Sequence, residues 1–295
     1  VPVGDHEEVA VEELVSHDAL PWIGAVQQLF DQYEGYRDKY LKMSQGSETY
    51  GDYESFQVKM DMSYSPEYQT RQYARLKGFE RQLLGGEYPN GEECEGEYAD
   101  PVTALFALTA SSLKDGEYRP SVDHDREIRE AWSGSSNSVK RTLRAVLEDG
   151  LGLSPGDYAW WWQSEPHPGE GAAAGYSHSH PVVVFDRAEA SAEGPDPTDP
   201  ETYRPVVAKH VSLCDNAQWE AHDIDNAVTV REGDDIDDFA TYVAEYVAVS
   251  PAQDLLERSP EYLMWAASQY ASSTAKYSRS SWATAACTAD KCAHE

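Results

Sequence analysis

Two histidines, His178 and His180, stand one residue apart and lead into an apolar run, HSHPVVVF. In a β-strand, residues i and i+2 project from the same face, so the two imidazoles would lie together and could bind one divalent cation. The apolar residues that follow predict a buried strand that fixes their position. Pro181 lacks a backbone donor and predicts an edge strand or a bulge at this point. The alternative interpretation is a solvated loop whose histidines have no chemical role.

A carboxylate is expected beside these histidines. Residues 158–165, YAWWWQSE, predict an aromatic strand that ends in Glu165, and the three Gly and two Pro of residues 166–175 predict a hairpin loop. Antiparallel strands joined in this way would place Glu165 next to His178 and His180. Glu170 in the loop is the reserve carboxylate, because the pattern does not fix the register. These side chains would form a three-ligand metal site with open coordination positions.

Two tyrosines are candidate nucleophiles. Four aspartates between residues 234 and 238 crowd the start of a predicted helix, where carboxylates interact favourably with the helix dipole. That helix carries Tyr242 and Tyr246, which are four residues apart and therefore share one face. The alternative is an aromatic stripe that packs into the core.

The most basic segment of the chain is a predicted helix that begins at Pro66 and ends at a Gly-Gly pair. It carries Arg71, Arg75, Lys77 and Arg81. Because its charge is opposite to that of the whole chain, the last three cations are candidates for contact with DNA phosphates. Ordinary surface charge is the alternative.

The remaining segments complete an α+β pattern. His210 and His222 fall in one of the predicted helices and are expected to be core or surface residues. Helices are predicted over residues 20–43, 123–132, 139–147 and 205–222, strands over 102–112 and 228–231, a polar linker over 46–55, a mobile acidic loop over 188–204, and a final segment rich in Ala, Ser and aromatic residues over 262–282.

The composition is strongly acidic, with 53 Asp and Glu against 23 Lys and Arg and a net charge of −30. DNA-binding surfaces are normally basic, so this charge alone argues against nucleic acid. However, the carboxylates are spread along the whole chain, which is typical of proteins that work in near-molar salt, where a Debye length of about 3 Å screens their repulsion. A salt-loving host is therefore favoured over an acidic DNA mimic. A DNA-binding protein in such a host must depend more on metal, stacking and shape.

Cysteines and apolar runs bear on the cellular compartment. None of the four cysteines forms a CxxC pair, and Cys287 and Cys292 with His294 lack an evident fourth zinc ligand, so free thiols in a reducing cytoplasm are expected. No run of 18 apolar residues is present, so no membrane-spanning helix is expected. The N-terminus lacks the basic and apolar pattern of a secretion signal.

The order of these motifs resembles the HUH endonucleases, in the branch of rolling-circle replication initiators (Rep proteins) found in haloarchaeal plasmids and pleomorphic viruses. The resemblance spans roughly residues 70–285. It rests on Tyr73–Arg81 (YARLKGFER), Leu108–Ser111 (LTAS), Glu165–His167 (EPH), Gly175–His180 (GYSHSH), Lys209–Val211 (KHV) and Tyr242–Val247 (YVAEYV).

The resemblance implies a domain organisation and a reaction. An HUH endonuclease domain with a central antiparallel sheet flanked by helices would occupy residues 66–250. It would follow an acidic, helical N-terminal region, residues 1–65, and precede a C-terminal helical or tail segment, residues 251–295. The implied reaction is metal-dependent nicking and rejoining of single-stranded origin DNA through a 5′-phosphotyrosine. Host helicase and polymerase are further expected partners, in the cytoplasm of a high-salt archaeal cell.

The resemblance also assigns roles to residues. His178, His180 and Glu165 would bind Mn²⁺ or Mg²⁺, with imidazole ligands favouring Mn²⁺. Tyr246, at the position that single-tyrosine relatives keep, would attack first, and Tyr242 second.

Two positions depart from the family pattern. The residue between the histidines is usually bulky and apolar but is Ser179 here, and many relatives have Lys where this chain has Glu245. The second change removes a cation that could hold phosphate. An HUH transposase or relaxase would share the chemistry. A non-catalytic acidic DNA-binding or DNA-mimic protein, with a vestigial histidine pair, is the alternative from another class.

Overall fold

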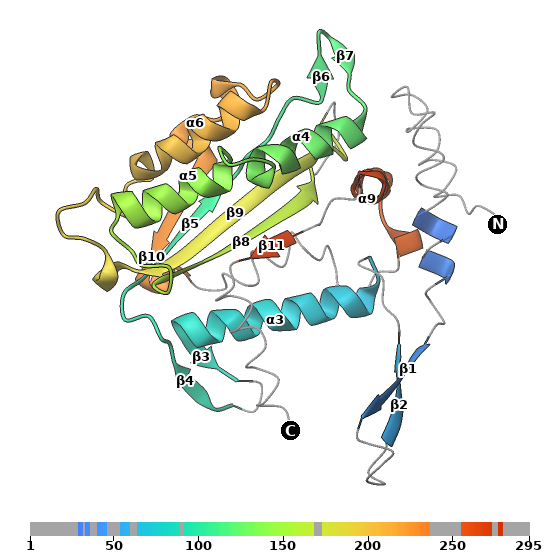
Figure 1. Ribbon diagram of the computed structural model, residues 1–295, viewed down its shortest axis with the longest axis horizontal. Helices are drawn as coiled ribbons and strands as arrows, with labels where there is room; N and C mark the ends of the chain where they lie inside the picture. The colour runs from blue at the N-terminus through green and yellow to red at the C-terminus, as the bar shows by residue number, and fades with distance from the viewer. Residues whose placement is uncertain are drawn as a thin grey trace.

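A five-stranded antiparallel sheet forms the centre of the protein (Figure 1). The computed structural model describes residues 29–31, 33–35, 40–45, 54–59, 64–88, 91–167, 173–236, 255–272 and 277–279. In spatial order the strands are β10 (Val228–Glu232), β5 (Pro101–Phe106), β9 (Ser177–Asp186), β8 (Tyr158–Pro166) and β11 (Tyr277–Arg279). Helices cover both faces of the sheet, so the expected α+β class is confirmed.

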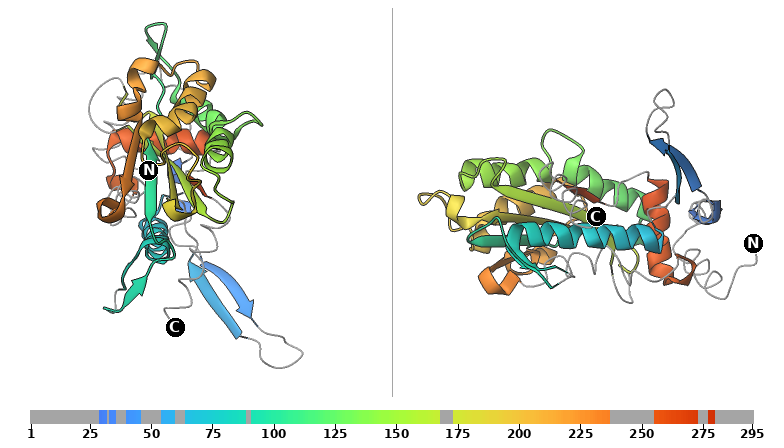
Figure 2. Two further views of the ribbon diagram at one scale, coloured as in Figure 1. Left: turned by 90° about the vertical axis from the view of Figure 1, so that its left-hand side faces the viewer. Right: turned by 90° about the horizontal axis from the view of Figure 1, so that it is seen from below.

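The two faces of the sheet are covered by different helices (Figures 1 and 2). Trp161 and Val182 on one face pack with Leu76 and Phe79 of helix α3. Side chains on the opposite face pack against helices α4, α5 and α6. The helix bounds are Pro66–Leu84 (α3), Ser121–Ser133 (α4), Val139–Ala145 (α5, continued by a π-helical turn over Val146–Gly150), Arg204–Leu213 (α6), Ile224–Ala227 (α7) and Pro260–Ala271 (α9).

Helix α3 begins and ends where the sequence predicts. The Ser65 hydroxyl accepts a hydrogen bond from the backbone N–H of Tyr68 at 3.2 Å, and Pro66 occupies the first turn, where no donor is needed. The helix is closed by Gly85, whose φ of 81° favours glycine. A Cβ at this position would lie 2.8 Å from the carbonyl oxygen of Cys94. That close contact follows from the hairpin of β3 (Gly85–Glu87) and β4 (Glu93–Glu95).

The prediction of an edge strand or bulge at Pro181 is wrong. Strand β9 is paired on both sides, and its register with β8 runs without a break through the Trp162–Pro181 pair. Ser179 donates its N–H to Leu108 across the other ladder, so by alternation the nitrogen of Pro181 faces β5 as well. The β5–β9 ladder is interrupted there, between the Leu105–Val182 pair and the Leu108–Ser179 bridge. The sheet therefore accommodates the missing donor as a local gap.

Residues 40–59 differ from the prediction of a helix through residue 43 followed by a polar linker. They contain an antiparallel hairpin of β1 (Tyr40–Gln45) and β2 (Glu54–Lys59), which projects away from the main sheet (Figure 2). Apolar and polar residues alternate in ESFQVK, a strand pattern that the linker interpretation overlooked. Residues 29–31 and 33–35 are helical.

The predicted strand 102–112 and helix 205–222 are both too long. Strand β5 ends at Phe106, and α6 ends at Leu213, where Cys214 is extended with φ −96° and ψ 109°. Asp215 and Asn216 then form a turn, so the helix does not continue. The carbonyl of Asn216 accepts a hydrogen bond from the N–H of Ser111 at 2.8 Å. A short 3₁₀ turn (Trp219–Ala221) and α7 follow.

The acidic segment 188–204, expected to be mobile, is held by hydrogen bonds. The carboxylate of Asp196 accepts from the backbone and hydroxyl of Thr198 at 2.9 and 2.8 Å. The buried Tyr203 donates its hydroxyl to Pro197 and packs edge-on against Phe106. Two 3₁₀ turns, Arg187–Glu189 and Pro200–Tyr203, complete the segment. Anchoring by an aromatic core residue explains why an acidic, Pro-rich sequence is ordered here.

The C-terminal part completes the sheet. Helix α9 packs against α4 and β8, and β11 pairs antiparallel with β8. A small hairpin of β6 (Leu113–Lys114) and β7 (Glu117–Tyr118) precedes α4. In the part of the chain that the structure describes, no helix has both the length and the apolar character needed to cross a bilayer.

Candidate metal centre

The hairpin of β8 and β9 places the candidate ligands opposite one another. Glu165 pairs with His178, and Gln163 pairs with His180, in one continuous antiparallel register. At the end of the strands, Gly175 has a φ of 74°, and a Cβ there would lie 2.9 Å from the carbonyl oxygen of Glu261. Because paired residues in a sheet project from the same face, Glu165, His178 and His180 all lie on the face that α3 covers.

Three ligand atoms converge at this point. The Nε2 atoms of His178 and His180 lie 2.9 and 2.5 Å from the same oxygen, Oε1 of Glu165. Glu165 is 2% exposed and His180 7% exposed, so the group is largely shielded from water. Within the described ranges, no other group of three His, Cys, Asp or Glu side chains has ligand atoms within 4.8 Å of one another.

The protonation states suit a cation. Burial raises the pKa of Glu165, but the nearby imidazoles of His178 and His180 outweigh it and leave the pKa below its usual value. Burial lowers the pKa of His178 despite the nearby carboxylate. At neutral pH the carboxylate is therefore ionised and His178 is neutral, which are the forms that bind metal.

The spacing between His178 Nε2 and Glu165 Oε1 suits two ligands of one metal ion. Although their atoms are close, His178 Nε2 and Glu165 Oε1 are buried and form no hydrogen bond of acceptable geometry with the described residues. Buried polar atoms are normally hydrogen-bonded or bound to a cation. An octahedral ion with bonds of about 2.1 Å places neighbouring ligands about 3.0 Å apart. The His178 contact already has this spacing, whereas the His180 contact needs to widen by roughly half an ångström.

A polar network that the sequence analysis missed lies on the opposite face of the same strand ends. Ser177, next to His178, donates its hydroxyl to the carboxylate of Asp125 at 2.7 Å. Gln269 of α9 donates to Asp125 and, at 3.1 Å, to Ser164, which is next to Glu165. Asp125 is 2% exposed. Its position three residues before the buried Ile128 of α4 was the available signal, because a carboxylate is unusual on an apolar stripe.

Glu165, His178 and His180 are called the metal group below, as the candidate ligands. His210 and His222 lie outside this group and bind backbone atoms. His210 donates from Nε2 to the carbonyl of Thr109 at 2.7 Å, and His222 Nε2 accepts the N–H of Thr109 at 3.2 Å. His124 binds the carbonyl of the next residue, Ala110, at 3.0 Å. These imidazoles therefore hold the segment whose Leu108 pairs with Ser179, the residue between the two candidate ligands.

The other predicted site residues are placed as follows. Tyr242, Tyr246 and Glu170 lie outside the described residues. On α3, Lys77 pairs with Glu80 at 2.8 Å, and the guanidinium of Arg81 lies 5.3 Å from the ring centre of Tyr88. Arg75 is half-buried.

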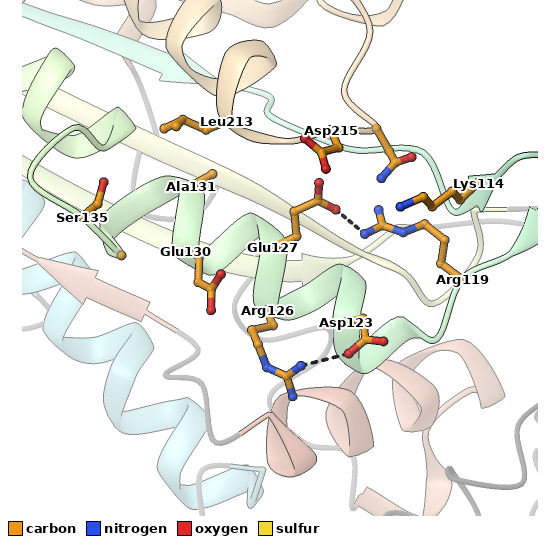
Figure 3. Close-up of a pocket in the computed structure, with 12 residues that line it drawn as sticks. Lys114, Arg119, Asp123, Arg126, Glu127, Glu130, Ala131, Ser135, Leu213 and Asp215 are labelled. Atoms are coloured by element: carbon orange, nitrogen blue, oxygen red, sulfur yellow. Dashed lines mark hydrogen bonds and ion pairs between the residues drawn. The ribbon is translucent and has the colours of Figure 1, made fainter.

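A separate pocket of about 640 Å³ lies between α4, the β6–β7 hairpin and the end of α6 (Figure 3). Ion pairs of Arg119 with Glu127 and of Arg126 with Asp123 lie along its wall. None of the three candidate metal ligands lines this pocket.

Comparison with known proteins gives one family. A family model described as "Putative rep protein (DUF1424)" matches residues 4–291. Similar curated proteins include two that are each named "Uncharacterized 36 kDa protein". One, from Halobacterium sp. (strain GN101), is 30% identical over 63% of this chain and 52% of its own length. The other, from Halobacterium salinarum, is 27% identical over 78% of this chain and 65% of its own length. The chain thus spans half to two thirds of these relatives. No solved structure matches.

Proposed function

We propose that this chain, which belongs to the Rep family matched above, initiates rolling-circle replication by nicking and rejoining single-stranded origin DNA. The observation that carries the nicking chemistry is the convergence of Glu165, His178 and His180 on one point of the sheet. Two imidazoles and one carboxylate favour Mn²⁺ over Mg²⁺ and leave positions open for substrate oxygens. The ion, when bound, supplies positive charge to the scissile phosphate.

The tyrosines supply the nucleophiles. The phenol oxygen of Tyr246 attacks phosphorus and the bond from phosphorus to the 3′ oxygen breaks, so that the 5′-phosphate stays on the tyrosine. The phenol proton goes to solvent, and the leaving 3′ oxygen takes up a proton to become a hydroxyl. Tyr242 performs the second transfer, which closes the new circle after one round of copying. The energy of the broken bond is kept in the phosphotyrosine, so rejoining needs no ATP.

The path of the chain supports a tyrosine near the metal group. Ile236, the last described residue before the tyrosine segment, is buried in the same cluster as Val182 and Val184. Those valines lie on the same face of β9 as His178 and His180. Tyr246 follows Ile236 by ten residues, a distance of about 15 Å in a helix and at most about 35 Å in an extended chain.

The expected setting is a cell with a high internal salt concentration. Two relatives come from Halobacterium, and the net charge of −30 fits proteins that are screened by concentrated salt. Origin DNA is the proposed substrate, and host helicase and polymerase are proposed partners in copying the displaced strand.

The proposed function is tested with single-stranded DNA from the replicon in about 3 M KCl, with Mn²⁺ or with EDTA. We expect nicking by the native protein with Mn²⁺ alone. The double variant His178→Ala/His180→Ala and the single variant Glu165→Gln should fold, as judged by circular dichroism, but lose nicking by at least a hundredfold. Glu189→Gln, an exposed carboxylate, is the control and should nick normally. Equal cleavage in EDTA, or by the double variant, would rule out this site.

A further inference from the structure

One segment of this acidic chain lacks carboxylates. The chain has one Asp or Glu in every five to six residues, since 53 occur among 295. Residues 131–147, AWSGSSNSVKRTLRAVL, contain Lys140, Arg141 and Arg144 but no acidic residue. This segment comprises the end of α4, an exposed serine-rich loop and α5. The helix that begins at Pro66 is therefore not the most basic segment, as was expected, because Glu67 and Glu80 reduce its net charge to +2, whereas residues 131–147 have a net charge of +3.

The cations of this segment gather in space with two others. Lys140 and Arg144 are one helical turn apart on α5, so they share a face. Burial lowers the pKa of Lys140, and the charges of Arg129, Arg141 and Arg144 lower it further, so each of these arginines is close enough to Lys140 to repel it. Lys209 of α6 reaches the adjacent loop, where its ammonium donates to the side-chain oxygen of Asn137 at 2.9 Å. We call Arg129, Lys140, Arg141, Arg144 and Lys209 the α5 basic patch.

Aromatic rings support the patch from below. The ammonium of Lys140 lies 4.7 Å from the ring centre of Trp160, and the guanidinium of Arg129 lies 4.6 Å from that of Trp162. Trp132 packs against both rings. Stacking on these rings reduces the entropy lost when the cations bind an anion.

Part of the positive charge of the patch is not neutralised by ion pairs. Arg144 pairs with Glu148 at 2.8 Å. Arg141 is exposed and makes no ion pair with any described residue. On α3, by contrast, Lys77 and Arg81 are already engaged with Glu80 and Tyr88.

We propose that the α5 basic patch binds the phosphate backbone of double-stranded DNA. Clustered Lys and Arg with neighbouring Ser and Asn side chains are the groups that contact phosphates without reading bases. Proteins that bind single strands add exposed aromatic side chains on which bases stack. Here Trp132 and Trp162 are buried and Trp160 lies under Lys140, so the patch offers phosphate contacts only.

The position of the patch suits duplex DNA next to a nicking site. Helices α4 and α5 cover the face of the sheet opposite to the metal group (Figure 1). Duplex on the patch therefore does not occupy the face that carries Glu165, His178 and His180. This inference rests on the proposed function in one respect, which is that the ligand is DNA.

The test measures binding of a labelled duplex of about 30 base pairs, without origin sequence, by fluorescence anisotropy over a series of KCl concentrations in which circular dichroism shows the fold intact. The variants are Arg141→Gln and Lys140→Gln/Arg141→Gln/Arg144→Gln. The control with the same change of charge is Arg187→Gln/Arg204→Gln/Arg231→Gln, at positions outside the patch. Each lost phosphate contact lowers the slope of log affinity against log salt by about 0.9, so the triple patch variant should lose about 2 to 3.

We expect duplex affinity to fall about tenfold or more in the triple patch variant, less in Arg141→Gln, and little in the control. Affinity for a single strand of the same sequence should change little. An unchanged salt slope, or an equal loss in the control, would overturn the patch. An equal loss for single-stranded DNA would overturn the duplex assignment. Nicking of a short single strand should persist in the patch variants. If the native protein binds duplex through this patch but never nicks, the proposed function is contradicted and the patch is not.

Discussion

Buried imidazoles hold the backbone next to the candidate ligands, and their titration should be visible in the stability of the protein. Burial lowers the pKa of both His124 and His210 to about 4, although each binds a backbone carbonyl that favours the protonated form. His210 faces His222, whose ring centre is 5.1 Å away, and the thiol of Cys214 at 3.7 Å. His124 is near Arg119, Glu127 and His178.

The free energy of unfolding should therefore fall as the pH is lowered from about 6.5 to about 4. In this window the unfolded state binds a proton at each imidazole and the folded state does not, so acid favours unfolding. Each histidine should cost about 2 kcal/mol between pH 6.5 and 5. Urea unfolding in about 3 M KCl, followed by circular dichroism, measures this. His210→Gln should reduce the proton uptake on unfolding by about one. A pH dependence identical to that of the native protein would show that His210 does not titrate in this way.

At the scale of residues, the convergence of Glu165, His178 and His180 could be predicted from the sequence because the geometry is local. His178 and His180 share a face through the period of a strand, and a short hairpin loop returns Glu165 to them. Asp125 could not be predicted in the same way. Its partners Ser177 and Gln269 are 52 and 144 residues away along the chain, and no local pattern connects them.

At the scale of elements, α4 and α9 together support the ends of β8 and β9 behind the metal group. Trp265 of α9 donates its indole N–H to Ser164 at 3.3 Å, and Ser272 donates to the second carboxylate oxygen of Asp125 at 2.6 Å. Since Ser164 and Ser177 are neighbours of Glu165 and His178, this network should fix the strand ends in the geometry that a cation needs.

Asp125→Asn should weaken Mn²⁺ binding about tenfold and destabilise the protein by about 1 to 3 kcal/mol. Asparagine keeps the shape, but it replaces one accepting oxygen with an NH2 donor that faces side chains which themselves donate. Isothermal titration with Mn²⁺ and urea unfolding measure the two effects. Asp123→Asn, exposed on the same helix, is the matched control and should leave Mn²⁺ affinity unchanged. A loss of stability with native Mn²⁺ affinity would mean that the network only supports the fold.

The bounds of a helix or strand were predicted correctly where adjacent residues set them, and wrongly where a contact with a distant part of the chain sets them. Helix α3 has a Ser65-Pro66 start and a glycine stop, and both are read from adjacent residues. Helix α6 was predicted too long because the turn after Leu213 is set by its contact with Ser111, far away in the chain. An edge strand or a bulge was expected in β9 because of Pro181, whereas the ladder with the neighbouring strand β5 has a gap there instead.

At the scale of the whole molecule, the net charge of −30 should make folding depend on salt. Lowering KCl from about 3 M to about 0.1 M lengthens the Debye length from about 2 Å to about 10 Å, so repulsion between carboxylates increases. Circular dichroism over this range should show loss of structure at the low end. Restoring the salt to a separate sample controls for aggregation. A fold unchanged at low salt would remove the halophilic explanation of the charge and favour the DNA-mimic alternative.

The central claim is that the metal group serves a tyrosine that attacks DNA. Mass-spectrometric mapping of the peptide that stays attached to a single-stranded origin oligonucleotide tests this most directly. The account predicts an adduct that forms with Mn²⁺, is absent in EDTA and is carried by Tyr246. Tyr246→Phe should abolish this first adduct, while Tyr242→Phe should cleave once but fail to complete strand transfer. DNA attached to Tyr242 alone would reverse the order of the two residues, and DNA attached to neither tyrosine would contradict the mechanism.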